Sequence, residues 1–131
     1  MDLNEKETVS RECLGCICEA ASGCNTTLGC TGDICGAFHI TWGYWADAGK
    51  PTLPGVSNTD LNAYSSCANN VQCAGLIVEG YMKKYAKDCD NDGVINCNDY
   101  VRIHYLGASG CSGALESKYE NAYNNCQQIF I

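Results

Sequence analysis

Basic residues are scarce in this chain of 131 residues: eight lysines and arginines stand against 15 aspartates and glutamates, which gives a formal net charge of −7. Nucleic-acid-binding domains present basic patches, so this balance argues against nucleic acid as a partner. The sequence also lacks a long apolar run, an internal repeat and a linker, which argues against a membrane span and against several domains. We expect one domain over residues 13–131, preceded by an N-terminal extension over residues 1–12.

An apolar leader is missing as well, because the first ten residues, MDLNEKETVS, are polar. We interpret the chain as a mature secreted domain with an added or retained Met1.

Cysteine is unusually abundant, with 12 copies whose spacing matches no paired CxxC or Cys/His zinc pattern. The even count favours up to six disulfides formed in an oxidising compartment, but it leaves their pairing open. The NTT triplet at Asn25 is a glycosylation acceptor pattern, which agrees with secretion.

Apolar periodicity predicts a small domain that is α+β in class and mostly α. The expected helices cover residues 10–24, 71–87, about 99–106, a C-terminal segment with Leu115, Tyr119, Ala122, Tyr123 and Cys126 on one face, and a segment that begins near Asp60 after a cap at Ser57 or Asn58. The alternation of Phe38, Ile40 and Trp42 predicts a short strand. Disulfides would staple these elements together, each typically stabilising the fold by ~2–4 kcal/mol.

From Cys13 to Cys126 the chain resembles the invertebrate-type lysozymes, the destabilase family, in four segments: CLGCICEAASGC, GCTGDICGAFHI, YWADAGKP and CNDYVRIHYLGASGC. The resemblance implies a small lysozyme-like fold and cleavage of peptidoglycan glycosidic bonds. Family members have a catalytic Glu just before Ser-Gly-Cys, where this chain has Ala21. Their second carboxylate, an Asp three residues after the next cysteine, corresponds to Asp33.

Loss of the catalytic Glu bears directly on activity. Glycoside hydrolysis needs a protonated carboxyl as acid and a second, ionised carboxylate, and general-acid help is worth about 10²–10⁴-fold. Ala21 has no proton to donate, so we expect lost or strongly reduced muramidase activity. The function that remains would be binding of a peptidoglycan-like glycan or an immune-modulating contact with another protein. Glu19 lies about 200° from Ala21 around a helix and is interpreted as a solvated carboxylate. A weakly active lysozyme of defence or digestion, using Glu19 or Glu12, is the alternative.

Other departures from the family concern isopeptide cleavage and one disulfide. Isopeptide cleavage in relatives is tied to a serine after the second carboxylate and to a downstream lysine, whereas this chain has Ile34 and Thr41 there. The family histidine is kept as His104, but it has no nucleophile to serve. Two family cysteines correspond to Ala48 and Ile77, and the loss of both leaves an even cysteine count, as expected if these two positions are bridged in relatives.

A glycan groove is expected to use aromatic and histidine side chains. The candidates are His39, Tyr44, Trp45 and His104. Tyr44 and Trp45 are adjacent in sequence, and two adjacent bulky rings cannot both face one core. Trp42 is also a candidate, although the alternation with Phe38 and Ile40 favours a place in the core.

The stretch DCDNDGVINCND matches the calcium-loop pattern D-x-[DN]-x-[DN]-G at each fixed position. The predicted ligands of a structural Ca²⁺ are Asp88, Asp90, Asp92, the Val94 carbonyl, Asn96 directly or through water, and Asp99, which replaces the usual Glu. The alternative is an acidic, solvated turn clamped by a bridge between Cys89 and Cys97. A calcium-dependent interaction module on a lysozyme scaffold is a third hypothesis for the function.

Overall fold

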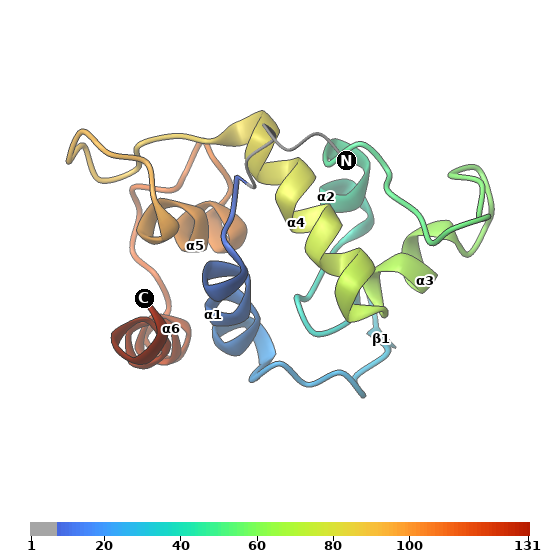
Figure 1. Ribbon diagram of the computed structural model, residues 1–131, viewed down its shortest axis with the longest axis horizontal. Helices are drawn as coiled ribbons and strands as arrows, with labels where there is room; N and C mark the ends of the chain where they lie inside the picture. The colour runs from blue at the N-terminus through green and yellow to red at the C-terminus, as the bar shows by residue number, and fades with distance from the viewer. Residues whose placement is uncertain (1–7) are drawn as a thin grey trace.

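Figure 1 shows the computed structural model of the chain, in which residues 8–131 are described. Their elements are α1 (Arg11–Ser22), β1 (Cys30–Thr31), β2 (Ile34–Cys35), α2 (Trp42–Asp47), α3 (Ala63–Ala68), α4 (Val71–Tyr85), α5 (Cys97–Leu106) and α6 (Ser117–Phe130). The mostly helical class is confirmed, and so are the helices predicted over 10–24, 71–87 and 99–106 and at the C-terminus. None of the described helices combines the length and the apolar character that crossing a membrane requires.

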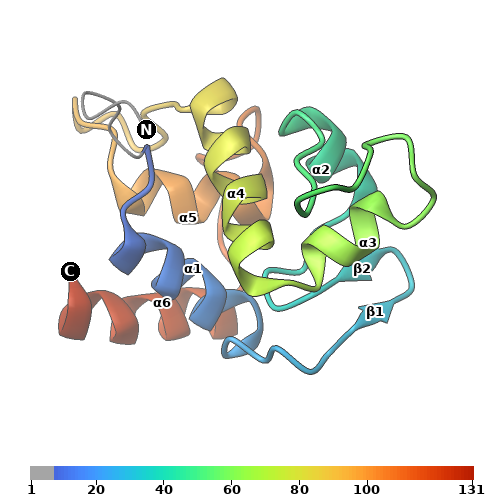
Figure 2. The ribbon, with the colours of Figure 1, turned by 45° about the vertical axis from the view of Figure 1, so that its right-hand side comes forward.

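The helix α4 runs through the middle of the molecule (Figure 1). Figure 2 shows α1, α5 and α6 on one side of α4, and α2, α3 and the β1–β2 hairpin on the other. The most extensive packing between two elements joins α1 to α6, and further contacts join α4 to α2, α3 and α5. The chain therefore forms two lobes on the two sides of one central helix.

Side-chain caps fix where the two main helices begin. The Ser10 hydroxyl accepts a 3.1 Å hydrogen bond from the Cys13 amide at the start of α1. The side-chain oxygen Oδ1 of Asn70 accepts one of 2.9 Å from the Cys73 amide at the start of α4. Such caps contribute about 1 kcal/mol each. Both helices then bury one face in a common core, with the fully or almost fully buried Cys16, Ile17, Ile77, Val78 and Met82.

All 12 cysteines form disulfides, as the even count predicted. The pairs are Cys13–Cys97, Cys16–Cys126, Cys18–Cys24, Cys30–Cys35, Cys67–Cys73 and Cys89–Cys111. The bridge between Cys89 and Cys97 considered for an acidic, solvated turn is not formed, because Cys97 pairs with Cys13 of α1 and Cys89 pairs with Cys111 after α5. The Cys16–Cys126 bridge spans 110 residues and ties α1 to α6, so it restricts the unfolded chain strongly.

The strand predicted from Phe38, Ile40 and Trp42 is absent from the described residues. Phe38 and Ile40 are buried as expected, but Ile40 forms only an isolated bridge with Cys35. Between them His39 has a φ of 54°, so the chain turns here instead of extending. Trp42 begins α2 and is 56% exposed. A tight turn that buries alternate residues produced the same pattern as a strand.

The helix predicted near Asp60 begins later, at Ala63. The Asp60 carboxylate accepts a 2.9 Å hydrogen bond from the Asn62 amide, and the Ser57 hydroxyl accepts one of 3.2 Å from the Thr59 amide. These short-range bonds stabilise turns, which compete with helix formation. The segment before α3 is therefore a series of turns at the surface.

The end of the expected N-terminal extension packs against the domain. Val9 is fully buried, and the Glu79 carboxylate of α4 accepts hydrogen bonds from the amides of Thr8 and Val9. Residues 1–7, the rest of the expected 1–12 extension, lie outside the described residues.

Candidate functional site

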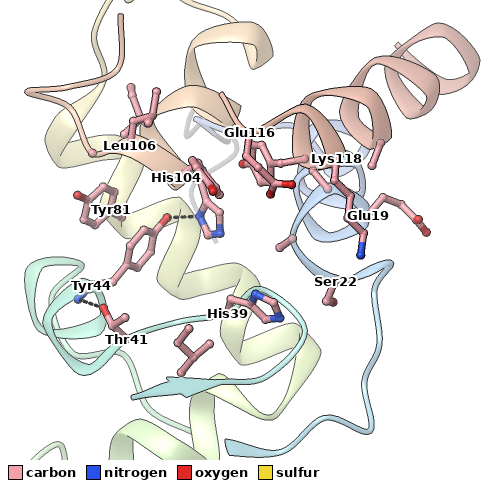
Figure 3. Close-up of a pocket in the computed structure, with 18 of the residues that line it drawn as sticks. Glu19, Ser22, His39, Thr41, Tyr44, Tyr81, His104, Leu106, Glu116 and Lys118 are labelled. Carbon is pink, nitrogen blue, oxygen red and sulfur yellow. Dashed lines mark hydrogen bonds between the residues drawn. The ribbon is translucent and has the colours of Figure 1, made fainter. Parts of the chain in front are cut away.

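A cleft of about 1050 Å³ opens between the two lobes. One wall comes from the end of α1, from α5 and from the start of α6, and the other from β2, the turn after it and α2. Figure 3 shows His104 and Glu116 facing His39 and Thr41 across this space, with Tyr44 and Tyr81 to one side. The cleft thus combines aromatic rings, two histidines and charged side chains from segments far apart in the sequence.

Tyr44 and His104 connect the two walls. The Tyr44 hydroxyl oxygen lies 2.8 Å from His104 Nδ1, and His104 Nε2 lies 2.8 Å from the Phe38 carbonyl oxygen. A carbonyl only accepts, so Nε2 carries the proton and donates, and Nδ1 accepts from the Tyr44 hydroxyl. Tyr81 stacks on Tyr44 with 3.9 Å between ring centroids. The imidazole is therefore held as one neutral tautomer.

The surroundings of this pair keep both groups neutral. Burial lowers the pKa of His104 to about 4, and the hydrogen bond to the Phe38 carbonyl opposes this only in part. Burial, followed by the neighbouring Tyr81 and Tyr119, raises the pKa of Tyr44 well above its ordinary value. His104 lies in the cleft wall as predicted, but both ring nitrogens are engaged, so it has no lone pair available to act as a base.

Ala21 and Asp33 occupy different places with respect to the cleft. Ala21 is half-buried in the last turn of α1 and lines the cleft. Asp33 lies exposed in the turn between β1 and β2, and its neighbour Ile34, rather than Asp33 itself, lines the cleft. The Tyr64 hydroxyl donates to the Asp33 carbonyl at 3.3 Å and to the Ile40 carbonyl at 2.5 Å, which holds the hairpin at the cleft edge.

Three carboxylates line the cleft, namely Glu19, Asp47 and Glu116, and each belongs to an exposed residue. The Glu19 side chain runs outward, away from His39 and His104 (Figure 3). Glu12 is exposed and is not part of the cleft lining. Sequence reasoning did not find Glu116, because the residue before an ordinary amphipathic helix matches no motif. Only the packing of α6 beside α1 brings Glu116 to the cleft.

The expectation that Trp45 lines the groove is corrected. Trp45 is only 2% exposed, and its indole nitrogen donates a 2.7 Å hydrogen bond to the Pro51 carbonyl. Trp42, three residues earlier on the same helical face, is the exposed tryptophan. Tyr44 lies on the other face of α2 and lines the cleft, as does His39 from the preceding turn. The helix, which the sequence did not predict here, separates the two rings that were expected together.

The predicted calcium loop joins α4 to α5. Carboxylate oxygens of Asp88, Asp90, Asp92 and Asp99 lie within 4.8 Å of one another. Asp99 is fully buried, and its two oxygens accept 2.9 Å hydrogen bonds from the amides of Cys89 and Asn96. The loop therefore brings four carboxylates together, of which Asp99 is buried, Asp88 is half-buried, and Asp90 and Asp92 are exposed.

Asp88 is the least satisfied of these groups. Its Oδ2 accepts a 2.9 Å hydrogen bond from the Gly93 amide, which is the main reason that the pKa of Asp88 is lowered. Its Oδ1 is enclosed and has no hydrogen-bond partner among the described residues. Asn96 caps α5 and accepts from the Asn98 amide, and Val94 is 54% exposed. The carboxylate and amide oxygens gathered here are the ligands that hard cations prefer.

The chain is similar to known proteins over almost its whole length. The Destabilase family matches residues 10–126. The chain is 41% identical to a lysozyme of Magallana gigas over 110 residues, 79% of this chain and 70% of that protein. It is 35% identical to Invertebrate-type lysozyme 3 of Caenorhabditis elegans over 121 residues, 89% of this chain and 86% of that protein. The crystal structure of Meretrix lusoria lysozyme in complex with Aeromonas hydrophila PliI is similar with a TM-score of 0.68 at 35% identity, covering 95% of this chain and 93% of that chain.

Proposed function

Because this chain belongs to the Destabilase family of invertebrate-type lysozymes, we propose that it binds peptidoglycan-like glycans with lost or strongly reduced muramidase activity. The observation that supports the proposal most is the place of Ala21. The family resemblance assigns the catalytic acid to this position, and the position lies in the cleft wall at the end of α1. A methyl group has no proton to transfer to the leaving glycosidic oxygen.

None of the three carboxylates that line the cleft is well placed to replace the lost acid. A carboxyl that protonates a leaving group near neutral pH needs an enclosed, apolar environment that raises its pKa. Glu19, Asp47 and Glu116 all belong to exposed residues, and Glu19 also runs outward (Figure 3). A weakly active lysozyme that uses Glu19 is the competing hypothesis, since Glu19 does reach the cleft rim.

The protein can bind a glycan without cleaving it, because the cleft is formed even though the catalytic acid is missing. Its volume of about 1050 Å³ lies at the upper end of ordinary ligand sites. Tyr81 and Tyr105 contribute ring surface, and Lys118 and Ser22 contribute polar groups. Rings that combine an apolar body with a polar tip suit ligands with apolar faces and hydroxyl edges.

The proposal is tested by sedimenting the protein with insoluble peptidoglycan while measuring released reducing ends. We expect the protein to pellet without measurable release. Tyr105→Ala, a change at a 48% exposed ring of the cleft, should reduce pelleting, whereas Leu76→Ala, a change at a 59% exposed residue of α4 outside the cleft, should not. Failure to pellet would contradict the binding function. Release of reducing ends that disappears in Glu19→Gln would support the weak lysozyme instead.

We also propose that the loop of residues 88–99 holds a structural Ca²⁺. Three aspartates within five residues repel one another unless a cation neutralises them. The enclosed, unpartnered Oδ1 of Asp88 would find a partner in such an ion, and an unsatisfied buried oxygen otherwise costs about 1–3 kcal/mol. Asp88, Asp90, Asp92 and Asp99 would supply carboxylate ligands, with the Val94 carbonyl and Asn96 completing the set. The ion would hold the end of α4 against the start of α5.

Isopeptide hydrolysis is proposed to be absent. Only Ile34 separates Asp33 from Cys35, so no serine nucleophile stands there. The ring nitrogens of His104 are both engaged in hydrogen bonds, so His104 would not activate a nucleophile elsewhere in the cleft.

We propose an extracellular location, since six disulfides form and persist in oxidising compartments. A role in defence or digestion would suit a glycan-binding protein there.

We also propose a protein as a second partner, by analogy with the Meretrix lusoria lysozyme, which forms a complex with Aeromonas hydrophila PliI. PliI is the obvious probe for such a contact.

A further inference from the structure

A second hollow, of about 290 Å³, lies outside the cleft and includes both tryptophans of the chain. Trp42 and Tyr44 are two residues apart on α2, which places them about 200° apart around the helix. Tyr44 lines the cleft, and Trp42 and Trp45 line the second hollow. The same short helix therefore presents aromatic rings to two separate concave surfaces.

The two tryptophans have different roles in this hollow. Trp45 is buried, and its indole nitrogen is bound to the Pro51 carbonyl, so Trp45 is part of the framework. Trp42 lies against it with 6.0 Å between ring centroids and remains 56% exposed. An indole that lines a hollow and stays more than half exposed offers a large apolar surface to a ligand, although Trp45 and Lys50 already contact part of it. Isolated surface leucines are common, whereas tryptophan is enriched among the residues that contribute most to binding.

The groups around Trp42 narrow the class of ligand. Lys50 Nζ lies 5.4 Å from the Trp42 ring centroid and 5.9 Å from that of Trp45. This ammonium group disfavours a cationic ligand on the same rings. Asp60, which also lines the hollow, disfavours an anion. Its carboxylate is oriented by the 2.9 Å hydrogen bond from the Asn62 amide.

The remaining polar groups both donate and accept. Asn58 has an amide and Thr59 a hydroxyl, and both line the hollow with Lys50 and Asp60. A purely apolar ligand would leave these groups without partners, at a cost. A neutral saccharide satisfies every requirement, because a pyranose ring has an apolar C–H face for Trp42 and a rim of hydroxyls that donate and accept.

We propose that this hollow is a second saccharide-binding site, which takes a short segment of a neutral glycan on the Trp42 ring. Its volume of about 290 Å³ lies at the lower limit of ordinary small-molecule sites, so it suits a glycan end rather than a long chain. The site stands on the opposite face of α2 from the cleft. It does not depend on whether the cleft retains or lacks muramidase activity.

The test uses tryptophan fluorescence, because the only two tryptophans of the chain both line this hollow. Triacetylchitotriose should change the tryptophan emission saturably in the wild-type protein. The cleft variant Tyr105→Ala should show the same titration, since Tyr105 lines the cleft and not the hollow. This comparison separates the second site from the proposed function of the cleft.

Calorimetry supplies the second readout, because Trp42→Ala also removes a fluorophore. Trp42→Ala and Asp60→Ala should each weaken binding at one site by about tenfold or more, as expected for loss of a central contact. Leu76→Ala, at an exposed residue outside both concavities, should bind as the wild type does. Circular dichroism of each variant checks that the fold is kept. An unchanged emission at saturating chitotriose, wild-type binding by Trp42→Ala, or preference for an acidic over a neutral oligosaccharide would overturn the proposal.

Discussion

The Tyr44 hydroxyl donates a 2.8 Å hydrogen bond to Nδ1 of His104, whose opposite nitrogen donates to the Phe38 carbonyl. These two bonds join α2, α5 and the turn after β2 across the inner end of the cleft. The histidine that the family resemblance suggested for chemistry or substrate contact therefore holds the two cleft walls in place.

Removing the donor to His104 should destabilise the fold. Tyr44→Phe keeps the stacking on Tyr81 but leaves Nδ1 of His104 without a donor in a buried place. We expect a loss of about 1–3 kcal/mol in the free energy of unfolding, measured by urea denaturation. Tyr105→Phe is the control, because the Tyr105 side chain is 48% exposed and its hydroxyl makes no hydrogen bond with the described residues. Equal losses in both variants would contradict the assigned role.

The low pKa of His104 predicts how stability depends on pH. Its pKa falls from 6.5 to about 4 on folding, so between these values the unfolded chain binds more protons than the folded chain. The contribution of His104 to the free energy of unfolding is complete above pH 6.5, decreases as the pH falls, and levels off below about 4. The decrease should amount to about 3 kcal/mol.

Denaturation series across this pH range check that prediction. His104→Asn should flatten the part of the pH dependence that lies between 6.5 and about 4. His39→Asn, a change at an exposed histidine of the cleft, should keep it. If the two variants show the same pH dependence, the neutral, doubly bonded imidazole is not the origin of the effect.

Gly36 and Gly55 form a matched pair for testing a close backbone contact. Their φ angles are 80° and 81°, so alanine is strained at both positions by a similar amount, about 1–2 kcal/mol. A Cβ on Gly36 would lie 1.9 Å from the Ala68 carbonyl oxygen, whereas a Cβ on Gly55 would meet no atom within 4 Å. Gly36→Ala should therefore lower the thermal midpoint far more than Gly55→Ala. Similar midpoints for both would show that the hairpin does not pack on the end of α3 as described.

Calcium should raise the melting temperature if the loop of residues 88–99 binds it. When free calcium exceeds the dissociation constant about 100-fold, the folded state gains ~2.7 kcal/mol by mass action. Asp90→Ala should abolish the gain, and Asp47→Asn, at an exposed carboxylate of the cleft, should keep it. Identical melts in calcium and in excess chelator, with no heat on calcium titration, would favour an acidic, solvated turn.

Sequence periodicity predicted the long helices well because their buried faces repeat over several turns. In α4 the spacing of Ala74, Val78 and Met82 leaves only one face for the core, and all three are buried. In the segment 38–42 the same kind of pattern has a different cause. His39 has a positive φ, so the chain turns there, and Phe38 and Ile40 on either side of the turn are both buried. Short segments contain too few repeats to separate a turn from a strand.

The candidate site was only partly predictable for a different reason. The resemblance placed Ala21 and His104, and its adjacency to Trp45 singled out Tyr44; all three line the cleft. Glu116 and Lys118 reach it only because the Cys16–Cys126 bridge and helix packing bring α6 beside α1. The even cysteine count predicted up to six bridges, but pairing is a tertiary property that spacing does not encode.

The release of reducing ends from peptidoglycan by the wild type and by Ala21→Glu, compared in one assay, decides whether the missing acid at position 21 limits catalysis. We expect the wild type to release almost none and Ala21→Glu to gain activity by about 10²–10⁴-fold, the usual contribution of a general acid. Ala21→Gln, which has the same shape without the acidic proton, should remain inactive. Wild-type turnover equal to that of Ala21→Glu would show that the loss of the acid at position 21 does not limit activity.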